Sequence, residues 1–326
     1  MDERETLFSC FSAELRTPLK TWFQKEEGMQ EIRLRVNRPL SIRWNGEEFF
    51  IDGQGLRVKD IGFAMVVTEQ QIEDTLSYMS DYSLYAYEEE IRQGYLTTKN
   101  GCRIGICGKV VLEGGRIKTI HHISSLNIRF PHEIKGCSEK LLPYIIEGDK
   151  VHNTLIISPP MCGKTTILRD LIRQISNGAY ALAGKALGKT VGVVDERGEI
   201  CACHLGVPQN DIGIKTDVLD GCPKVEGMMM LVRTMAPEVI AVDEIGSEEE
   251  LQTMRYSMNC GCSILATAHG ASIEELFKKK VFLMGREEGL FSRYIVLSRR
   301  QGAGTIEGVF DGKGNCIKIL QNGGRI

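Results

Sequence analysis

The sequence predicts an α/β domain with a mostly parallel sheet in the second half of the chain, preceded by a smaller α+β domain. In the second half, short apolar runs alternate with helix-like runs, as in Thr154 to Ile157 followed by Lys164 to Ser176. A parallel sheet with helices on both faces requires this alternation. In the first half, residues 32–36 alternate apolar side chains with arginines, and Asn45-Gly46 separates two strand-like runs as a hairpin turn does.

The remaining elements follow from turn and capping signals. In the second half we expect strands at Thr190 to Val194, Val239 to Val242 and Ser263 to Ala266, a helix from Lys224 to Met235, and helix starts at the capping boxes of Ser247 and Ser272. In the first half, the box at Thr68 predicts a helix from Glu69 to Met79, and Gly101 to Val111 predicts a glycine-spaced strand. The polar stretch 147–150 is the expected junction, which gives domains at residues 1–149 and 150–326.

Composition places the chain among ordinary folded proteins. It has 326 residues, of which 42% are hydrophobic and 25% charged, so disorder is excluded as its general state. A net charge of −3 and a pI near 6.1 do not favour a protein that coats nucleic acid. The acidic start and the lack of an apolar run of about 18 residues predict a cytosolic chain that touches a membrane only through a partner.

Eleven cysteines without a secretory signal indicate reduced thiols. Two pairs have one residue between the cysteines, Cys201 with Cys203 and Cys260 with Cys262. Zinc knuckles usually have two intervening residues, so we interpret these cysteines as small buried hydrophobes and expect no zinc site.

A phosphate-binding loop is predicted between the strand at 154–157 and the following helix. Its residues are Ser158, Pro159, Pro160, Met161, Cys162, Gly163, Lys164, Thr165 and Thr166. Successive amides of such a loop and the positive end of the helix converge on phosphate oxygens. Lys164 is expected to reach the β and γ phosphates of ATP, and the Thr165 hydroxyl to ligate Mg²⁺. The pattern departs from its usual form at one position, because Ser158 stands where the first glycine is expected.

Two acids follow the apolar strand Val239 to Val242. Asp243 and Glu244 are placed at the carboxyl end of that strand, the edge where open parallel sheets bind ligands. We expect Asp243 to hold the Mg²⁺ shell and Glu244 to orient or deprotonate the attacking water. The pair Asp195-Glu196 ends another strand, and either supplies a further carboxylate or is a solvated strand end. His269, after a third strand, is either a sensor of the γ-phosphate or an ordinary loop histidine.

Arginine supply is the remaining requirement, since a guanidinium on the γ-phosphate can raise turnover by orders of magnitude. The candidates are Arg233, on the helix before the Asp243 strand, and Arg103 and Arg129 in the first half, which could face the nucleotide of a neighbouring subunit. The alternative for each is an ordinary surface charge or ion pair.

With these motifs in this order, the chain resembles the type II/IV secretion ATPases, in which the corresponding features are called Walker A, Asp box, Walker B and His box. The segments 30–39, 123–129 and 294–300 resemble the stage III sporulation AA branch of that superfamily. The resemblance covers nearly the whole chain. Asp243 is a second departure, because many secretion ATPases have a non-acidic residue before the glutamate, and it leaves open whether Glu196 or Glu244 is the principal base.

The resemblance implies a RecA-like P-loop ATPase core hinged to an N-terminal domain for oligomerisation or partner docking. It further implies a ring, expected to be a hexamer, that docks on a membrane protein and powers a secretion-like channel from the mother cell to the forespore. Two alternatives stay open. The first is a RecA-like nucleic-acid translocase, which has the same ATPase core. The net negative charge of the chain and its two tryptophans count against this function. The second is a scaffold protein that binds ATP and hydrolyses little of it. Its support in the sequence is Ser158, which replaces the first glycine of the phosphate-binding loop.

Overall fold

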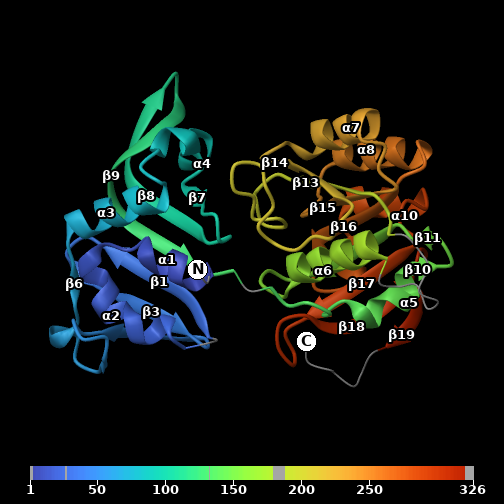
Figure 1. Cartoon of the computed structure of the whole chain (residues 1–326). Coiled ribbons are helices and arrows are strands. Elements are labelled where there is room, and N and C mark those ends of the chain that lie inside the picture. The colour runs from blue at the N-terminus through green and yellow to red at the C-terminus, as the bar shows by residue number, and fades with distance from the viewer. Residues whose placement is uncertain (1–2, 26–27, 132, 179–187, 320–326) are drawn as a thin grey trace. The chain divides into compact units, whose positions relative to one another are not determined.

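The structure is a computed structural model that describes residues 3–25, 28–131, 133–178 and 188–319. Its internal contacts divide the chain into two compact units, Met1–His132 and Glu133–Ile326 (Figure 1). Within the described residues, no helix has both the length and the apolar character needed to cross a bilayer.

The first unit is an α+β fold built on one antiparallel sheet, whose strand order is β5-β4-β3-β1-β9-β8-β7. In chain order its elements are α1 (Glu3–Ser9), α2 (Ala13–Phe23), β1 (Met29–Arg35), β2 (Arg38–Pro39), β3 (Ser41–Trp44), β4 (Glu47–Ile51), β5 (Arg57–Val58), η1 (Ile61–Phe63), β6 (Val66–Val67), α3 (Glu69–Met79), η2 (Leu84–Tyr87), α4 (Glu88–Arg92), β7 (Tyr95–Thr97), β8 (Arg103–Glu113) and β9 (Arg116–Arg129). The short strands β2 and β6 pair with each other.

Local sequence signals account for much of this unit. Ile32 and Leu34 are buried on one face of β1, as their alternation with arginines predicts. Asn45-Gly46 forms the turn between β3 and β4, with φ values of 50° and 85° that suit a tight hairpin. The capping box at Thr68 is formed on both sides, and α3 runs from Glu69 to Met79 as predicted.

The second unit contains an eight-stranded sheet of order β14-β13-β15-β16-β12-β17-β18-β19. The pairings from β14 to β17 are parallel, and β18 and β19 extend the sheet antiparallel. In chain order its elements are η3 (Glu139–Leu141), α5 (Leu142–Ile145), β10 (Ile146–Glu147), β11 (Lys150–Val151), β12 (Thr154–Ser158), α6 (Lys164–Asn177), β13 (Val191–Asp195), β14 (Thr216–Asp220), α7 (Lys224–Thr234), β15 (Val239–Val242), α8 (Glu248–Asn259), β16 (Ser263–His269), α9 (Ile273–Phe277), α10 (Lys280–Glu287), β17 (Arg293–Ser298), β18 (Thr305–Asp311) and β19 (Cys316–Ile319). The α/β class with a parallel-rich sheet, and the α+β unit before it, are therefore confirmed.

Helices cover both faces of this sheet. On β12, Ile156 packs with the buried face of α6, whereas Leu155 and Ile157 pack with residues of α7 to α10. Successive residues of a strand point to opposite faces of the sheet. A continuous apolar run such as 154–157 therefore contributes side chains to the hydrophobic core on each face. The buried sheet holds the carboxyl ends of β12, β13, β15 and β16 at one edge, where the predicted site residues lie.

Two expectations differ from the structure. The expected junction, residues 147–150, lies within the second unit, where Gly148 and Asp149 connect the hairpin strands β10 and β11. The polar residues that suggested a linker therefore form a hairpin turn. Composition alone does not distinguish the two, because linkers and hairpin turns contain the same residue types. The strand predicted at 263–266 continues to His269, so this histidine ends a strand and does not follow one.

Candidate active site

The predicted phosphate-binding loop leaves β12 at Ser158, and α6 begins at Lys164. Ser158 is a fully buried strand residue that pairs with His269 of β16, and its hydroxyl donates to the carbonyl of Pro159 at 2.7 Å. Its φ is not positive, so this position does not need a glycine. The departure at Ser158 is therefore compatible with an intact loop conformation.

Gly163 is the position of the loop where a glycine is required. It caps α6 with φ of 84°, and a Cβ there would lie 3.1 Å from the amide nitrogen of Gly304. Gly304 in turn donates its N–H to the carbonyl of Cys162 at 2.8 Å. The loop therefore packs against the turn between β17 and β18. The first turn of α6 contains no acidic residue, so its unpaired amides suit an anion.

A chain of polar contacts connects Lys164 of the loop to Glu244. Lys164, only 5% exposed, places its Nζ 3.2 Å from Nδ1 of His269. Nε2 of the same ring lies 2.7 Å from Oε1 of Glu244. A neutral imidazole that accepts from Lys164 and donates to Glu244 satisfies both contacts. The other carboxylate oxygen of Glu244, Oε2, accepts from Arg197 at 2.8 Å.

The expected Mg²⁺ ligands lie together. The Thr165 hydroxyl donates to Oδ2 of Asp243 at 2.6 Å, and Thr267 of β16 donates to Oδ1 of the same carboxylate. Thr267 Oγ1 also accepts the N–H of Glu244 at 2.9 Å. A hydroxyl and a carboxylate oxygen form the donor set that Mg²⁺ takes beside phosphate oxygens, so Thr165 and Asp243 fit that ion.

Glu244 has a left-handed backbone, with φ of 53°. Lys224, at the start of α7, donates to its carbonyl at 2.9 Å and to Oε1 of Glu250 at 2.9 Å. Oε2 of Glu250 accepts the amides of Gly246 and Ser247. These bonds hold a non-glycine residue in a conformation that costs about 1–3 kcal/mol, and they fix where the Glu244 side chain begins.

The two acids of the second pair, Asp195 and Glu196, make different contacts. Asp195 is 2% exposed, and its carboxylate accepts the amides of Glu199, Ile200 and Cys201. Burial raises its pKa, although these amides act in the opposite direction. The carboxylate of Glu196 lies 3.3 Å from Lys224 Nζ, outside the chain of contacts that starts at Lys164.

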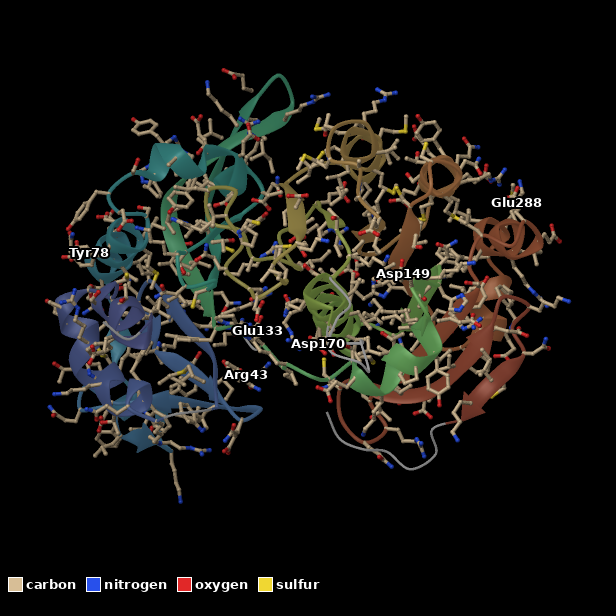
Figure 2. All side chains as sticks on the ribbon, turned by 45° about the vertical axis from the view of Figure 1, so that its right-hand side comes forward. Arg43, Tyr78, Glu133, Asp149, Asp170 and Glu288 are labelled. Carbon is tan, nitrogen blue, oxygen red and sulfur yellow. The ribbon has the colours of Figure 1, made fainter. Side chains whose placement is uncertain are left out.

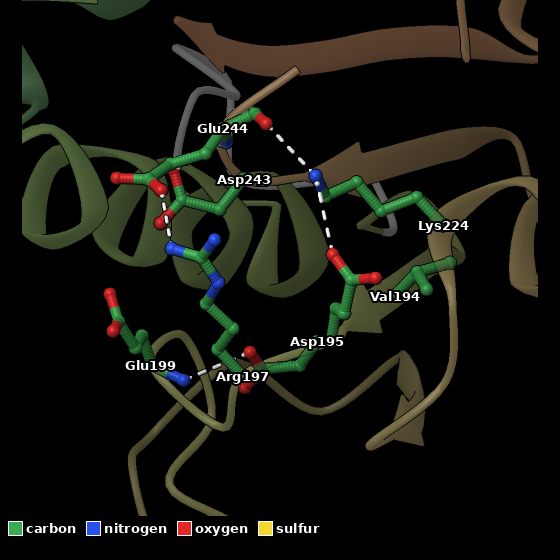
Figure 3. A pocket seen from close by; sticks show the side chains of 8 residues that line it. Val194, Asp195, Arg197, Glu199, Lys224, Asp243 and Glu244 are labelled. Carbon is green, nitrogen blue, oxygen red and sulfur yellow. Dashed lines mark hydrogen bonds and ion pairs between the residues drawn. The ribbon is translucent and has the colours of Figure 1, made fainter. Parts of the chain in front are cut away.

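Some of these groups line one pocket, in which Arg197 and Glu244 approach each other from opposite sides (Figure 3). Its lining residues are Val194, Asp195, Glu196, Arg197, Glu199, Lys224, Asp243 and Glu244. The pocket thus combines Asp243 and Glu244 with the loop after β13.

A buried carboxylate connects α6 to the start of the second unit. Asp170, labelled in Figure 2, is 3% exposed and accepts the amides of Gly136 and Ser138, the Ser138 hydroxyl and the Arg173 guanidinium. Burial acts to raise the pKa of Asp170, but the bonds from Ser138, Arg173 and Gly136 outweigh it and lower the pKa to about 2. The helix that starts at the phosphate loop is therefore bonded to residues 136–138.

The three arginines named from the sequence are not in this pocket. Arg233 is exposed in the last turn of α7, before β15, and so lies toward the amino edge of the sheet, opposite Asp243. Arg103 and Arg129 are in the first unit, where they pair across β8 and β9, and Arg103 lies 3.8 Å from the ring centroid of Tyr95. Within its own chain, Arg233 is not placed to reach a phosphate bound at Lys164.

Sequence reasoning missed Arg197, Thr267 and Lys224. Arg197 follows Asp195-Glu196 directly, and Thr267 precedes His269 by two residues, so both stood inside motifs already noted. Lys224 carried no such signal, because a lysine that begins a helix is usually exposed. Of the paired cysteines, Cys201, Cys203 and Cys262 are buried as interpreted, whereas Cys260 is exposed.

Comparison with solved structures defines the fold class. The chain is similar to the pilus retraction motor PilT with bound ADP, with a TM-score of 0.55 and 16% identity over 86% of this chain and 77% of that one. It is also similar to the ATPase DotB of Legionella pneumophila, with a TM-score of 0.51 and 13% identity over 82% of this chain and 72% of that one. At these identities the likeness concerns the fold, which is the RecA-like fold of the type II/IV secretion ATPases.

Comparison with family models and curated proteins identifies a particular family within this fold class. Residues 1–317 match the family described as "Sporulation stage III, protein AA", and the chain belongs to this family. It is 39% identical over 300 residues to the stage III sporulation protein AA of Bacillus subtilis, covering 92% of this chain and 91% of that protein. A shorter likeness, 30% identity over 173 residues, connects 49% of the chain to 28% of the uncharacterized protein ycf45 of Porphyra purpurea. The resemblance read from the sequence motifs is thereby confirmed.

Proposed function

We propose that the chain is a Mg²⁺-dependent ATPase that hydrolyses ATP to ADP and phosphate and drives a secretion-like complex during endospore formation. The observation that carries the proposal is the meeting of Thr165 and Asp243 at 2.6 Å, next to a buried Lys164. A phosphate loop, a cation site and a carboxylate for water activation are the parts that phosphoryl transfer needs.

Each residue has a distinct role in this proposal. The loop from Ser158 to Thr166 binds the phosphates with the backbone N–H groups that follow Pro160, and Lys164 neutralises the β and γ phosphates. Thr165 and Asp243 would hold Mg²⁺, which supplies charge neutralisation on the phosphate oxygens when bound. Glu244 orients the attacking water and accepts its proton. His269, bonded to both Lys164 and Glu244, connects the occupancy of the phosphate site to the base.

Glu244 is assigned as the principal base because its carboxylate belongs to the contact chain of Lys164. Glu196 has a different partner, Lys224, at 3.3 Å. We assign Glu196 to a supporting role, in which it shares Lys224 with Glu250 and the carbonyl of Glu244.

The assembly is also part of the proposal. We infer a homo-oligomer, expected to be a hexamer, in the mother-cell cytoplasm, attached to the membrane through a membrane-protein partner and without a direct role for nucleic acid. The family membership supports the sporulation setting, and the fold supports a motor. In such a ring the first unit would dock partners and present Arg103 or Arg129 to the nucleotide of a neighbour.

The proposal is tested by ATP hydrolysis measured against protein concentration at saturating Mg²⁺ and ATP. A ring with arginines supplied between subunits gives a specific activity that rises as the chain assembles, and light scattering on the same samples reports the oligomer. A protein that binds ATP but shows no hydrolysis at any concentration would instead support a nucleotide-gated scaffold.

A further inference from the structure

Among the described arginines of the second unit, Arg197 differs from the others because it contacts Glu244 directly. Its NH1 donates to Oε2 of Glu244 at 2.8 Å, while Oε1 of the same carboxylate lies 2.7 Å from His269. Both carboxylate oxygens of Glu244 therefore have a protein nitrogen within hydrogen-bond distance. The guanidinium thus occupies the place beside Oε2 that a water bonded to this oxygen would take.

The backbone that carries Arg197 is fixed on both sides of its loop. Asp195 accepts the amides of Glu199, Ile200 and Cys201, and Arg169 of α6 donates to the carbonyls of Glu199 and Ile200. The Arg197 side chain is nevertheless 63% exposed. A long, exposed side chain on a fixed backbone can change its hydrogen-bond partner while the loop keeps its conformation.

The energetic balance favours such a change. An ion pair with a largely exposed arginine is weak, because water and salt screen it. A γ-phosphate carries more negative charge than one carboxylate, and its oxygens accept two parallel bonds from a guanidinium. The γ-phosphate site is expected at Lys164, and a single imidazole separates Lys164 from Glu244.

We propose that Arg197 is a catalytic arginine supplied by the same subunit, which exchanges Glu244 for the γ-phosphate when ATP binds. The exchange releases Oε2 of Glu244. Water then attacks the γ-phosphorus, its proton passes to Glu244, and the bond to the β-phosphate oxygen breaks with the electron pair remaining on ADP. Arg197 thereby couples the presence of a γ-phosphate to the availability of the base. This inference rests on the proposed ATPase function.

The test compares the wild type, Arg197→Ala, Arg197→Lys and Arg255→Ala. Arg255 is the matched control, since it is a half-exposed arginine of the second unit paired with a glutamate, Glu288, away from the pocket. For each protein, kcat and KM are measured for ATP, and dissociation constants for ADP and for β,γ-imido-ATP are measured by calorimetry. Equal thermal midpoints verify that the folds match.

Arg197→Ala is expected to lose kcat by at least about tenfold. It should bind ADP like the wild type but lose the preference for the imido-ATP triphosphate, and Arg197→Lys should restore part of both properties. Arg255→Ala should behave as the wild type. Wild-type values for Arg197→Ala in both measurements would overturn the proposal.

Other outcomes are equally decisive. A lower kcat with an unchanged preference for the triphosphate would overturn the exchange, because Arg197 would then only position Glu244. If Arg197→Ala fails to fold, the Arg197→Lys protein decides, since it keeps the charge but loses the paired donors. A wild type that neither binds nor hydrolyses ATP would overturn the ATPase function itself, which distinguishes that failure from a failure of the Arg197 role.

Discussion

Thr165 and Asp243 are 78 positions apart in the chain, and the hydroxyl of one lies 2.6 Å from the carboxylate of the other. Sheet topology produces this meeting, because β12 and β15 are parallel strands that flank β16 and end at the same edge. Thr267 of β16 bonds the same carboxylate and so fixes its orientation. A hydroxyl and a carboxylate oxygen placed together in this way are the ligands that the proposed Mg²⁺ site needs.

Removal of either member of this pair is expected to weaken the Mg²⁺ dependence of hydrolysis. Thr165→Val and Asp243→Asn should each raise the Mg²⁺ concentration for half-maximal activity by at least about tenfold, since even outer-shell ligands have effects of that size. Thr234→Val is the control, because the Thr234 hydroxyl bonds only its own helix at Met230 among the described contacts. A titration of activity with MgCl₂ measures the shift. An unchanged midpoint in Asp243→Asn would contradict the assignment.

Substitution of the two glutamates separates the principal base from its neighbour. Glu244→Gln keeps the shape of the side chain but removes the proton acceptor, so kcat should fall by about 10²- to 10⁴-fold while ATP still binds. Glu196→Gln should have a smaller effect, because among the described residues the ion pair of Glu196 is with Lys224. Steady-state hydrolysis and calorimetric binding decide between them. Wild-type turnover in Glu244→Gln, with loss only in Glu196→Gln, would reverse the assignment.

Asp170 is expected to make the free energy of unfolding of the second unit depend on pH. Its pKa in the folded chain is about 2, below the usual value of 3.8, so the carboxylate stabilises the fold above pH 4. That contribution is on the order of 2 kcal/mol and is lost as the pH falls from about 4 to 2. Asp170→Asn should therefore be less stable than the wild type at pH 7.

The measurement for Asp170 is urea unfolding at a series of pH values. The difference between the wild type and Asp170→Asn should be largest at neutral pH and should shrink toward pH 2. Asp149→Asn is the control, since Asp149 forms an ion pair with Lys189 but is 84% exposed. A difference between wild type and Asp170→Asn that does not change with pH would contradict the role of the carboxylate charge.

The arginines of the first unit are expected to act in trans. An inactive Arg103→Ala or Arg129→Ala chain, mixed with inactive Glu244→Gln, should recover part of the activity, because some interfaces then contain both intact groups. Labelled chains must show that subunits exchange. Exchange without recovered activity would count against supply in trans, and full activity of the fragment 133–326 would contradict it entirely.

Much of the fold could be predicted because local signals agree with it. The capping boxes at Thr68 and Ser247, the turn at Asn45-Gly46 and the apolar runs of β12 and β15 all form as expected. The unit boundary could not be predicted, because a polar Gly-Asp turn suits a hairpin as well as a linker.

The site was predictable where chemistry follows sequence spacing. Lys164, Thr165, Asp243 and Glu244 meet because each follows a strand of one parallel sheet. Arg197 and Lys224 were missed because their contacts depend on side chains that reach across the pocket, and no spacing rule fixes those. Arg233 illustrates the converse, since its place near Asp243 in the sequence becomes the opposite edge of the sheet in space.

The most direct test of an ATP site at this loop is calorimetric titration of the full chain with Mg-ATP, for the wild type and for Lys164→Ala. Lys164 is almost completely buried at the start of α6, and its Nζ contacts only His269 among the hydrogen bonds of the described residues. Loss of this cation should remove most of the ATP affinity while the thermal midpoint stays near that of the wild type. The same affinity for ATP in a folded Lys164→Ala protein would contradict the phosphate-binding loop, and with it the proposed ATPase.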